Sequence, residues 1–305
     1  MRTAVIEQRC KSLLNRVSVP SFPFRWSINP YRGCEHACVY CYARRYHEYL
    51  ELDPGRGFET RIIAKVNAPQ VLERELARRT WQREWVAIGT AVDPYQPAEG
   101  RYRLTRRILE LLLAFRTPCS IVTKNTMILR DLDILRALAA GPGCEVCFSV
   151  TTLDRALAQQ IEPDTPPPRR RLEVMGRLAE AKIPAGVLIA PVLPGITDAP
   201  SAIRAVAAAA VERGAHFLRW GILRLEGATR EVFFDFLSRS HPELRPAYQR
   251  AYERSAAPEA YRRRIEQLLH EIRQEAGIPD RPQPGSGPSG PGDRPRQQPL
   301  FPPPG

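Results

Sequence analysis

The chain has 305 residues, of which 43% are hydrophobic and 26% charged, and it carries a formal net charge of +12. That length and apolar content suit a soluble protein with one large domain or two small ones, and no run of about eighteen apolar residues is present that would span a membrane. The N-terminus lacks the apolar stretch of a secretory signal, so we expect a cytoplasmic protein whose seven cysteines are thiols or metal ligands and form no disulfide framework.

The positive charge comes almost entirely from arginine, since the chain contains only four lysines. Net positive charge attracts nucleic acids and other polyanions. Chains rich in arginine, alanine and proline also arise from GC-rich coding sequences without selection for any partner. The composition therefore permits a nucleic-acid partner and does not require one.

Short apolar segments alternate with longer amphipathic ones along most of the chain. Strands are predicted at residues 24–28, 62–66, 85–89, 120–123, 146–150, 185–189 and 216–220. Helices are predicted at residues 42–50, 69–79, 104–115, 131–140, 170–181 and 199–213, with a proline-rich loop before the fifth of them. Short buried strands that alternate with helices indicate an α/β fold of parallel β/α units. Taken alone, this pattern permits either a barrel or a doubly wound sheet.

The alternation divides the chain into four regions. Residues 1–23 are predicted to be an irregular N-terminal lead-in, and residues 24–225 form the core domain. Helical segments broken by prolines occupy residues 226–277 and are expected to cap one end of the core. Residues 278–305 are mainly Pro, Gly, Ser, Gln and Arg, which leaves too few apolar side chains for packing, so this tail is predicted to be disordered.

A group of three cysteines follows the first strand. Cys34, Cys38 and Cys41 lie within eight residues, on a stretch that Pro30 and Gly33 keep out of regular structure. Thiolates at this spacing repel one another unless a cation lies among them, so the spacing favours a metal site. An iron–sulfur cube takes one cysteine on each iron. Three cysteines leave one iron open, and an open coordination position is typical of a site that carries out chemistry.

Polar residues also follow the later strands. In parallel β/α folds the loops after the strands converge on one face. On that face, beside the three cysteines, we place Thr90, Asp93, Lys124, Asn125, Ser149 and Thr151. Lys124 follows an apolar strand in a chain with few lysines, and a cation beside an iron–sulfur site suits an anionic ligand such as the carboxylate of an amino acid.

The remaining strand cysteines fall on the opposite face. Cys119, Cys144 and Cys147 lie at the starts of their strands and would in principle hold a second metal. Small buried thiols are the more common role for cysteines in such positions. We therefore predict that these three are buried free thiols.

Two alternatives to an enzyme remain open from the residues alone. In a zinc-stabilised nucleic-acid-binding protein without catalysis, His36 or His47 would complete a tetrahedral site with the three cysteines, and the arginines would bind nucleic acid. A protein that holds a cluster but has lost catalysis is the other alternative. Iron content distinguishes the zinc protein from a protein that holds a cluster, and turnover distinguishes an enzyme from a cluster-bearing protein without catalysis.

The cysteine loop, together with five further motifs, resembles one family. It reads NPYRGCEHACVYCYA over residues 29–43 and is similar to the cluster loop of radical S-adenosylmethionine (SAM) enzymes, in the branch related to spore photoproduct lyase. The likeness continues at residues 89–97, 123–125, 129–133, 162–163 and 190–195. It implies a partial (β/α)6 barrel of the radical SAM type with a C-terminal helical extension and a disordered tail. It also implies reductive cleavage of SAM at a [4Fe-4S] cluster, giving a 5′-deoxyadenosyl radical that abstracts hydrogen from an unidentified substrate, for which nucleic acid is a candidate.

The resemblance assigns roles to particular residues. By it, Cys34, Cys38 and Cys41 hold three irons, and the amino and carboxylate groups of SAM chelate the fourth. The residues that would contact SAM are Tyr40, Thr90, Lys124 and Ser149. Asp93 and Tyr95, on the loop where a substrate would bind, are candidates for the substrate side. Glu162 and Arg171 are assigned either to the site or to a structural ion pair around the proline-rich loop.

The resemblance also implies partners, and it has a limit. A reducing electron donor of the flavodoxin or ferredoxin kind would supply the electron. Spore photoproduct lyase uses a cysteine at the end of its second strand as a hydrogen donor, where this chain has Gly89. Repair of thymine dimers by that mechanism is therefore not expected here.

Overall fold

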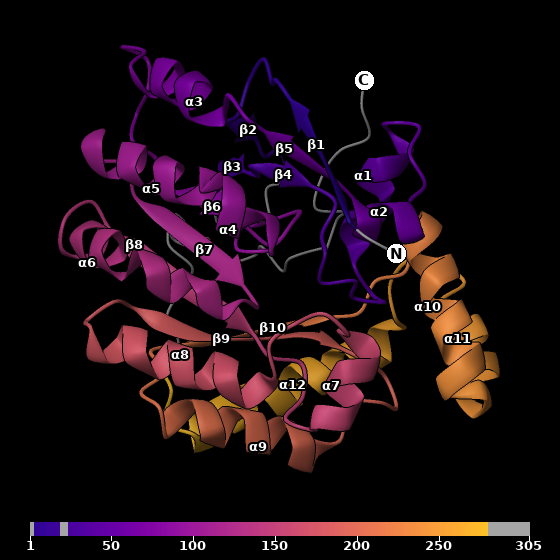
Figure 1. Ribbon diagram of the computed structural model, residues 1–305. Coiled ribbons are helices and arrows are strands. Elements are labelled where there is room, and N and C mark those ends of the chain that lie inside the picture. Colours follow the sequence, from indigo (N-terminus) through magenta and orange to yellow (C-terminus); the bar gives the residue numbers. More distant parts are fainter. Residues whose placement is uncertain (1–2, 19–23, 280–305) are drawn as a thin grey trace.

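The computed structural model describes residues 3–18 and 24–279, and within them a seven-stranded sheet lies at the centre of the molecule (Figure 1). Its parallel strands are β3 (Trp26–Ile28), β6 (Val86–Ile88), β7 (Cys119–Thr123), β8 (Cys144–Ser149), β9 (Ala185–Val192) and β10 (Leu218–Ile222). These strands lie side by side in chain order. Every crossover therefore advances the sheet in one direction, as in a β/α barrel, whereas a doubly wound sheet reverses its order midway. The predicted partial (β/α)6 barrel is confirmed.

The helices between these strands cover the outer face of the sheet (Figure 1). They are α3 (Ala68–Leu76), α5 (Leu104–Ala114), α6 (Leu132–Ala140), α8 (Pro168–Glu180) and α9 (Pro200–Val211). Each buries one apolar stripe against the strands, as Leu104, Ile108 and Leu112 do in α5. Both α8 and α9 begin with proline, which suits the first helical turn because its missing N–H would have no partner there. The stripes and strands form one continuous core.

One segment predicted as a loop contains a helix. After β8 the chain forms α7 (Arg155–Ile161) before the run of prolines begins. Asp154 caps this helix, because its side chain accepts hydrogen bonds from the backbone N–H groups of Ala156 and Leu157 at 2.8 and 3.1 Å. With seven residues the helix is too short to display a clear apolar period, which explains why the sequence pattern missed it.

Shorter helical segments lie in the loops. They are η1 (Tyr42–Arg44), α1 (Arg45–Glu48), α2 (Arg56–Thr60), α4 (Ala98–Tyr102), η2 (Thr126–Asp131) and η3 (Pro242–Leu244). The single helix predicted after the third cysteine is thus a 3₁₀ turn followed by a short α-helix.

The N-terminal region is more regular than predicted. Strand β1 (Ala4–Gln8) pairs in parallel with β5 (Arg61–Lys65), which also pairs with β4 (Tyr31–Arg32), and β2 (Asn15–Arg16) pairs with β3. The prediction of an irregular lead-in is therefore wrong for these residues, because the pairing partner of β1 lies far along the chain and leaves no local signal. Residues 1–2 and 19–23, and the part of the predicted tail from 280 to 305, lie outside the described residues.

Three helices form the C-terminal extension. They are α10 (Gly227–Ser240), α11 (Arg245–Ala251) and α12 (Glu259–Glu275). Helix α12 packs on α9 and β10, whereas α10 lies beside α1 near the cysteine loop (Figure 1). Ile278, predicted to begin the tail, is buried in the core. No helix among the described residues is long and apolar enough to cross a membrane.

Candidate active site

The loop that carries the three cysteines is fixed by close packing at Gly33 and by hydrogen bonds from a neighbouring segment. Gly33 begins it with φ +74°, and a Cβ atom there would lie 2.9 Å from the carbonyl oxygens of Phe58 and Arg61, so glycine is required. Gln96 holds the loop from the segment after β6. Its side chain accepts a hydrogen bond from the Glu35 N–H and donates one to the Gly33 carbonyl, both at 3.1 Å. The loop is therefore shaped by its neighbours before any ligand binds.

The three thiols are shielded from solvent and close enough to affect one another. Cys34 and Cys38 are 7% and 6% exposed, Cys41 is half-buried, and all three are free. Burial raises the pKa of each thiol, to about 12 for Cys38. Because the thiolate is the form that binds metal, these side chains need a cation at the site to ionise.

The arrangement fits a cluster better than a single ion. Among the described residues, no three His, Cys, Asp or Glu side chains converge on a position for one metal ion. A structural zinc ion needs ligands that converge on one position. An iron–sulfur cube binds each cysteine at a different iron, and its ligands stay apart. Three free thiols on one loop, two of them buried and one half-buried, fit a [4Fe-4S] cluster whose fourth iron takes another ligand.

Lys124, which follows β7, places a positive charge beside this loop. Its Nζ atom lies 5.7 Å from the centroid of the Tyr40 ring. Burial lowers the pKa of Lys124, but the negative charges of the Cys38 thiolate and the Glu162 carboxylate outweigh burial, so its pKa is raised and the ammonium stays charged. Within the described residues, that ammonium has no hydrogen-bond or ion-pair partner. The charge is available to an anionic ligand.

Glu162 organises a buried polar network on the other side of Tyr40. Its carboxylate accepts hydrogen bonds from the hydroxyl groups of Tyr40 and of Thr151, the latter at 2.9 Å, and pairs with Arg171 at 2.5 Å. Arg171 is fully buried and also donates to the carbonyl of Ser149 at 3.0 Å. Burial raises the pKa of Glu162, but the Arg171 guanidinium outweighs it and the pKa is lowered. The interpretation of these two residues as an ion pair is confirmed.

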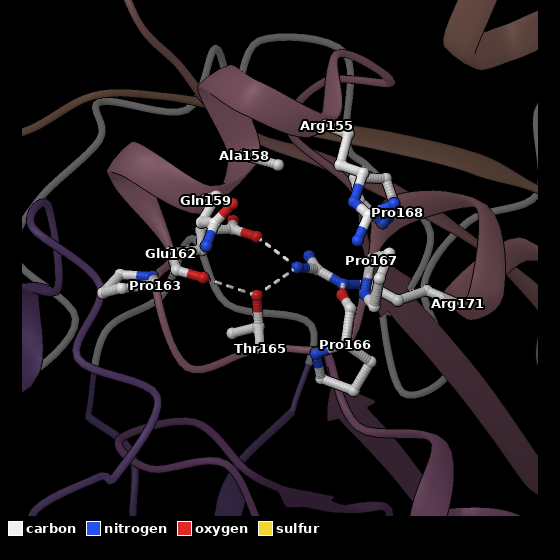
Figure 2. Close-up of a pocket in the computed structure, with 10 residues that line it drawn as sticks. All are labelled: Arg155, Ala158, Gln159, Glu162, Pro163, Thr165, Pro166, Pro167, Pro168 and Arg171. Carbon is white, nitrogen blue, oxygen red and sulfur yellow. Dashed lines mark hydrogen bonds and ion pairs between the residues drawn. The ribbon is translucent and has the colours of Figure 1, made fainter.

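A cavity of about 140 Å³ opens beside this ion pair, between the end of α7 and the start of α8 (Figure 2). Arg155, Gln159 and the prolines at 166–168 form part of its wall. Figure 2 shows Arg171 reaching across the cavity to Glu162 and Thr165. The ion pair thus connects this cavity to the cysteine loop.

Thr90 and Ser149 lie close to the loop and are already hydrogen bonded. The Asn29 side chain donates to the Thr90 hydroxyl at 3.1 Å, and the Tyr42 hydroxyl donates to the Thr90 carbonyl. Ser149 donates to the carbonyl of Ala190 at 3.0 Å. The structure therefore brings together the residues predicted to contact SAM, while the contacts themselves stay a prediction.

Asp93 and Tyr95 have structural partners in this fold. The Asp93 carboxylate accepts hydrogen bonds from the Thr123 hydroxyl at 2.7 Å and from the N–H groups of Lys124 and Tyr95 at 2.7 and 2.9 Å. Burial raises its pKa, but His36, whose Nδ1 lies 3.4 Å away, and these hydrogen bonds outweigh burial and lower it to about 2. Tyr95 is fully buried. Asp93 thus braces the loop, and a substrate contact by either residue stays a prediction.

Contacts that are distant in sequence were missed. Thr229 of α10 donates to the carbonyl of Cys41 at 2.8 Å, and Glu48 accepts a hydrogen bond from the Ala228 N–H at 3.1 Å. No local sequence pattern predicts these hydrogen-bond partners. By contrast Cys119, Cys144 and Cys147 are buried free thiols, as predicted.

Comparisons with known proteins agree with this geometry. The family model of the radical SAM superfamily matches residues 28–204. An uncharacterised protein of Mycobacterium tuberculosis is 41% identical over 265 residues, which are 86% of this chain and 78% of the relative, and one of Methanocaldococcus jannaschii is 26% identical over 88% of this chain and 93% of its own length.

Solved structures show the same fold. Spore photoproduct lyase complexed with dinucleoside spore photoproduct superposes with a TM-score of 0.67 at 14% identity, covering 89% of this chain and 79% of the lyase. Streptococcus suis SuiB bound to S-adenosylmethionine has a TM-score of 0.50 at 12% identity, covering 82% of this chain and 47% of SuiB. The family model covers more than half of the length of this chain. The chain therefore belongs to the radical SAM superfamily, whose enzymes use a [4Fe-4S] cluster and S-adenosylmethionine.

Proposed function

We propose that this radical SAM enzyme abstracts a hydrogen atom from a nucleic-acid substrate, using SAM held by Tyr40, Thr90, Lys124 and Ser149. The observation that carries the binding mode is the ammonium of Lys124, which is charged, lies beside Tyr40 and has no hydrogen-bond or ion-pair partner among the described residues. A carboxylate of SAM would supply that partner.

The chain's own residues prepare the site for this ligand. Cys34, Cys38 and Cys41 would hold the cluster by three of its irons and leave the fourth for SAM. Bound there and reduced by an external one-electron donor, the cluster and SAM would supply radical hydrogen-abstraction chemistry to the substrate. Glu162, which pairs with Arg171, accepts a hydrogen bond from the Tyr40 hydroxyl and so fixes the Tyr40 side chain. Burial of these groups excludes water from the reacting atoms.

Two observations support a nucleic-acid substrate. The net charge of +12 favours polyanions. The similar lyase structure contains a dinucleoside spore photoproduct. The hydrogen-donor cysteine of the lyase corresponds to Gly89 here, so we propose a reaction that does not depend on a cysteine at that position.

We further propose a cytoplasmic location and a flavodoxin- or ferredoxin-like electron donor. The seven cysteines are all free, which suits a reducing compartment. Either donor would supply one electron to the cluster, and a chemical reductant such as dithionite can supply that electron in its place.

The test is anaerobic purification and cluster reconstitution, followed by reduction with dithionite in the presence of SAM. We expect bound iron and sulfide, and 5′-deoxyadenosine whose yield rises with added DNA or RNA. Replacing any one of Cys34, Cys38 or Cys41 with alanine should abolish both, whereas the matched control Cys10→Ala should keep both. Full iron content and turnover in a loop-cysteine variant would contradict the proposal.

Two further measurements test SAM binding and the class of the substrate independently. Lys124→Met should keep its iron but lose most of the change that SAM causes in the electron paramagnetic resonance spectrum of the reduced cluster. Deuterium transfer from labelled DNA or RNA into 5′-deoxyadenosine would identify the substrate class. A yield of 5′-deoxyadenosine that no nucleic acid changes would contradict the nucleic-acid part alone.

A further inference from the structure

A second cavity lies against the small sheet formed by β1, β4 and β5. It has a volume of about 200 Å³. Of the described residues that line it, four are cations and none is a carboxylate; the cations are Arg9, Lys11, Arg32 and Lys65. The exposed residues Arg9 and Lys11 lie in the segment that follows β1, and Arg32 and Lys65 belong to β4 and β5. A concave surface with one sign of charge concentrates ions of the opposite sign.

Lys65 is the buried cation of this wall. It is 7% exposed, and its Nζ atom donates one hydrogen bond, to the carbonyl of Asn29 at 2.8 Å. An ammonium has three donors, and within the described residues no ion pair or second hydrogen bond uses the other two. Arg32, which is half-buried, likewise has no hydrogen-bond or ion-pair partner in the described part of the chain. A buried ammonium with only one hydrogen bond is costly, so Lys65, with the unpaired guanidinium of Arg32 in the same wall, points to a missing counter-ion.

No neighbouring acid within residues 3–18 and 24–279 supplies that counter-ion. Glu75 of α3 interacts with Lys65, but its carboxylate accepts hydrogen bonds from the N–H groups of Leu13 and Leu14 at 3.2 and 2.9 Å and does not line the cavity. Burial raises the pKa of the Cys10 thiol, which therefore adds no negative charge. Burial, and then Arg32, lower the pKa of Lys65 to about 8.

We propose that this cavity binds an oxyanion of the phosphate class, with Lys65 and Arg32 as its inner ligands and Arg9 and Lys11 at its rim. A planar guanidinium and an ammonium offer the several N–H donors that a tetrahedral oxyanion accepts. Ser12 in the same wall adds a hydroxyl as a neutral donor. The bound group is either a free phosphate ion or a phosphodiester of nucleic acid, and the chemistry of recognition is the same.

This anion site is separate from the site of SAM chemistry but connected to it by one residue. The backbone carbonyl of Asn29 holds Lys65, while its side chain holds Thr90 and accepts a hydrogen bond from the Ala91 N–H at 2.9 Å. Binding of an anion does not require SAM cleavage, so the proposal does not depend on the proposed substrate.

Calorimetric titration of the reconstituted full-length enzyme with sulfate, in a buffer without other oxyanions, tests the site. Sulfate keeps its charge between about pH 7 and pH 9, whereas Lys65 loses its proton near pH 8 when the cavity is empty. We expect saturable binding to one site that weakens toward pH 9. Lys65→Met should bind sulfate at least about tenfold more weakly at pH 7 and lose the pH dependence.

Two matched variants keep the result interpretable. Arg74→Gln removes an exposed cation of α3 that lies outside the cavity wall and should bind sulfate like the wild type. Lys11→Gln removes an exposed rim cation without touching the core and should weaken binding about threefold, even if Lys65→Met fails to fold. The absence of saturable sulfate binding overturns the proposal, and so does binding that neither cavity variant weakens.

Titrations with inorganic phosphate and with a short single-stranded oligonucleotide distinguish the two sources of the oxyanion. Loss of affinity for both ligands in the cavity variants assigns the site to nucleic-acid phosphodiesters. Loss for phosphate alone assigns it to a free ion. Unchanged affinity for both ligands contradicts the site, without bearing on SAM cleavage.

Discussion

Glu162 shows how one buried carboxylate determines the setting of several functional groups. It contacts Tyr40 in the cysteine loop, Thr151 after β8 and Arg171 in α8, which are far apart in sequence. With Glu162 and Arg171 each only 1% exposed at the side chain, water does not compete for either charge. Removing one partner leaves the other charge buried and unpaired.

The Glu162→Gln variant should therefore lose about 3 kcal/mol of unfolding free energy, measured by denaturant titration. Glu173→Gln is the matched control, because Glu173 pairs with Arg170 of the same helix at 2.6 Å but both side chains are largely exposed. Its loss should stay below about 0.5 kcal/mol. If both variants lost the same unfolding free energy, burial of the ion pair between Glu162 and Arg171 would make no difference to its contribution to stability.

At the scale of elements, the C-terminal extension supports the cysteine loop. Helix α10 begins beside α1, where Thr229 donates to the Cys41 carbonyl, Glu48 accepts from the Ala228 N–H, and Arg45 pairs with Glu226 at 3.1 Å. The helix thus fixes the end of the loop that carries the third cysteine. A cluster held by that loop is released only when the loop opens.

Thr229→Val should accordingly release iron to a chelator several-fold faster than the wild type under anaerobic conditions, with a loss of about 1 kcal/mol in stability from one buried hydrogen bond. Thr60→Val, which removes a surface hydroxyl bonded to the Arg56 carbonyl at 2.8 Å, is the control and should leave the rate unchanged. If both variants released iron at the same rate, the contact between α10 and the cysteine loop would have no effect on how long the protein retains its cluster.

Strand β9 meets β10 at a position where no side chain fits. A Cβ atom on Gly186 would lie 2.4 Å from the carbonyl oxygen of Phe217 and 2.5 Å from its ring. Gly186→Ala should destabilise the protein by about 1–3 kcal/mol in thermal or denaturant unfolding, because the two strands must separate to admit the methyl group.

The matched glycine is Gly100 in α4. A Cβ atom there would meet only the Met127 methyl group at 3.6 Å, an ordinary contact. Gly100→Ala should therefore be neutral, or stabilising by up to about 1 kcal/mol, since alanine favours helix. A stable Gly186→Ala protein would show that β9 and β10 separate at little cost.

For the whole molecule, the net charge of +12 should govern any binding of nucleic acid. Affinity for a short oligonucleotide should fall by about tenfold or more when salt rises from about 50 to 200 mM, because cations on the protein displace counter-ions from phosphates. Fluorescence anisotropy measures this directly, with an uncharged peptide nucleic acid of the same sequence as the control. An affinity that does not change with salt concentration would show that the arginines do not contact the phosphates of the oligonucleotide.

The sequence alone determined the features that have a local signature. Apolar strands alternating with amphipathic helices predicted the parallel β/α units, and the spacing of Cys34, Cys38 and Cys41 predicted the metal site. Both signals repeat over a few residues, and each can be interpreted without knowledge of the rest of the chain. The loops after parallel strands meet on one face, so Lys124 was placed beside the cysteines by topology alone.

Only the tertiary structure decided which distant groups meet. It paired β1 with β5, joined Glu162 to Tyr40, seated Thr229 on the cysteine loop and gathered Lys65 and Arg32 around one cavity. Such partners are selected by packing and by the need to satisfy buried polar groups, which depend on the whole fold and leave no periodic trace in the chain. Asp93 illustrates the difference, because the sequence marked it as a polar residue on the active face, and the fold made it a brace between His36 and Thr123.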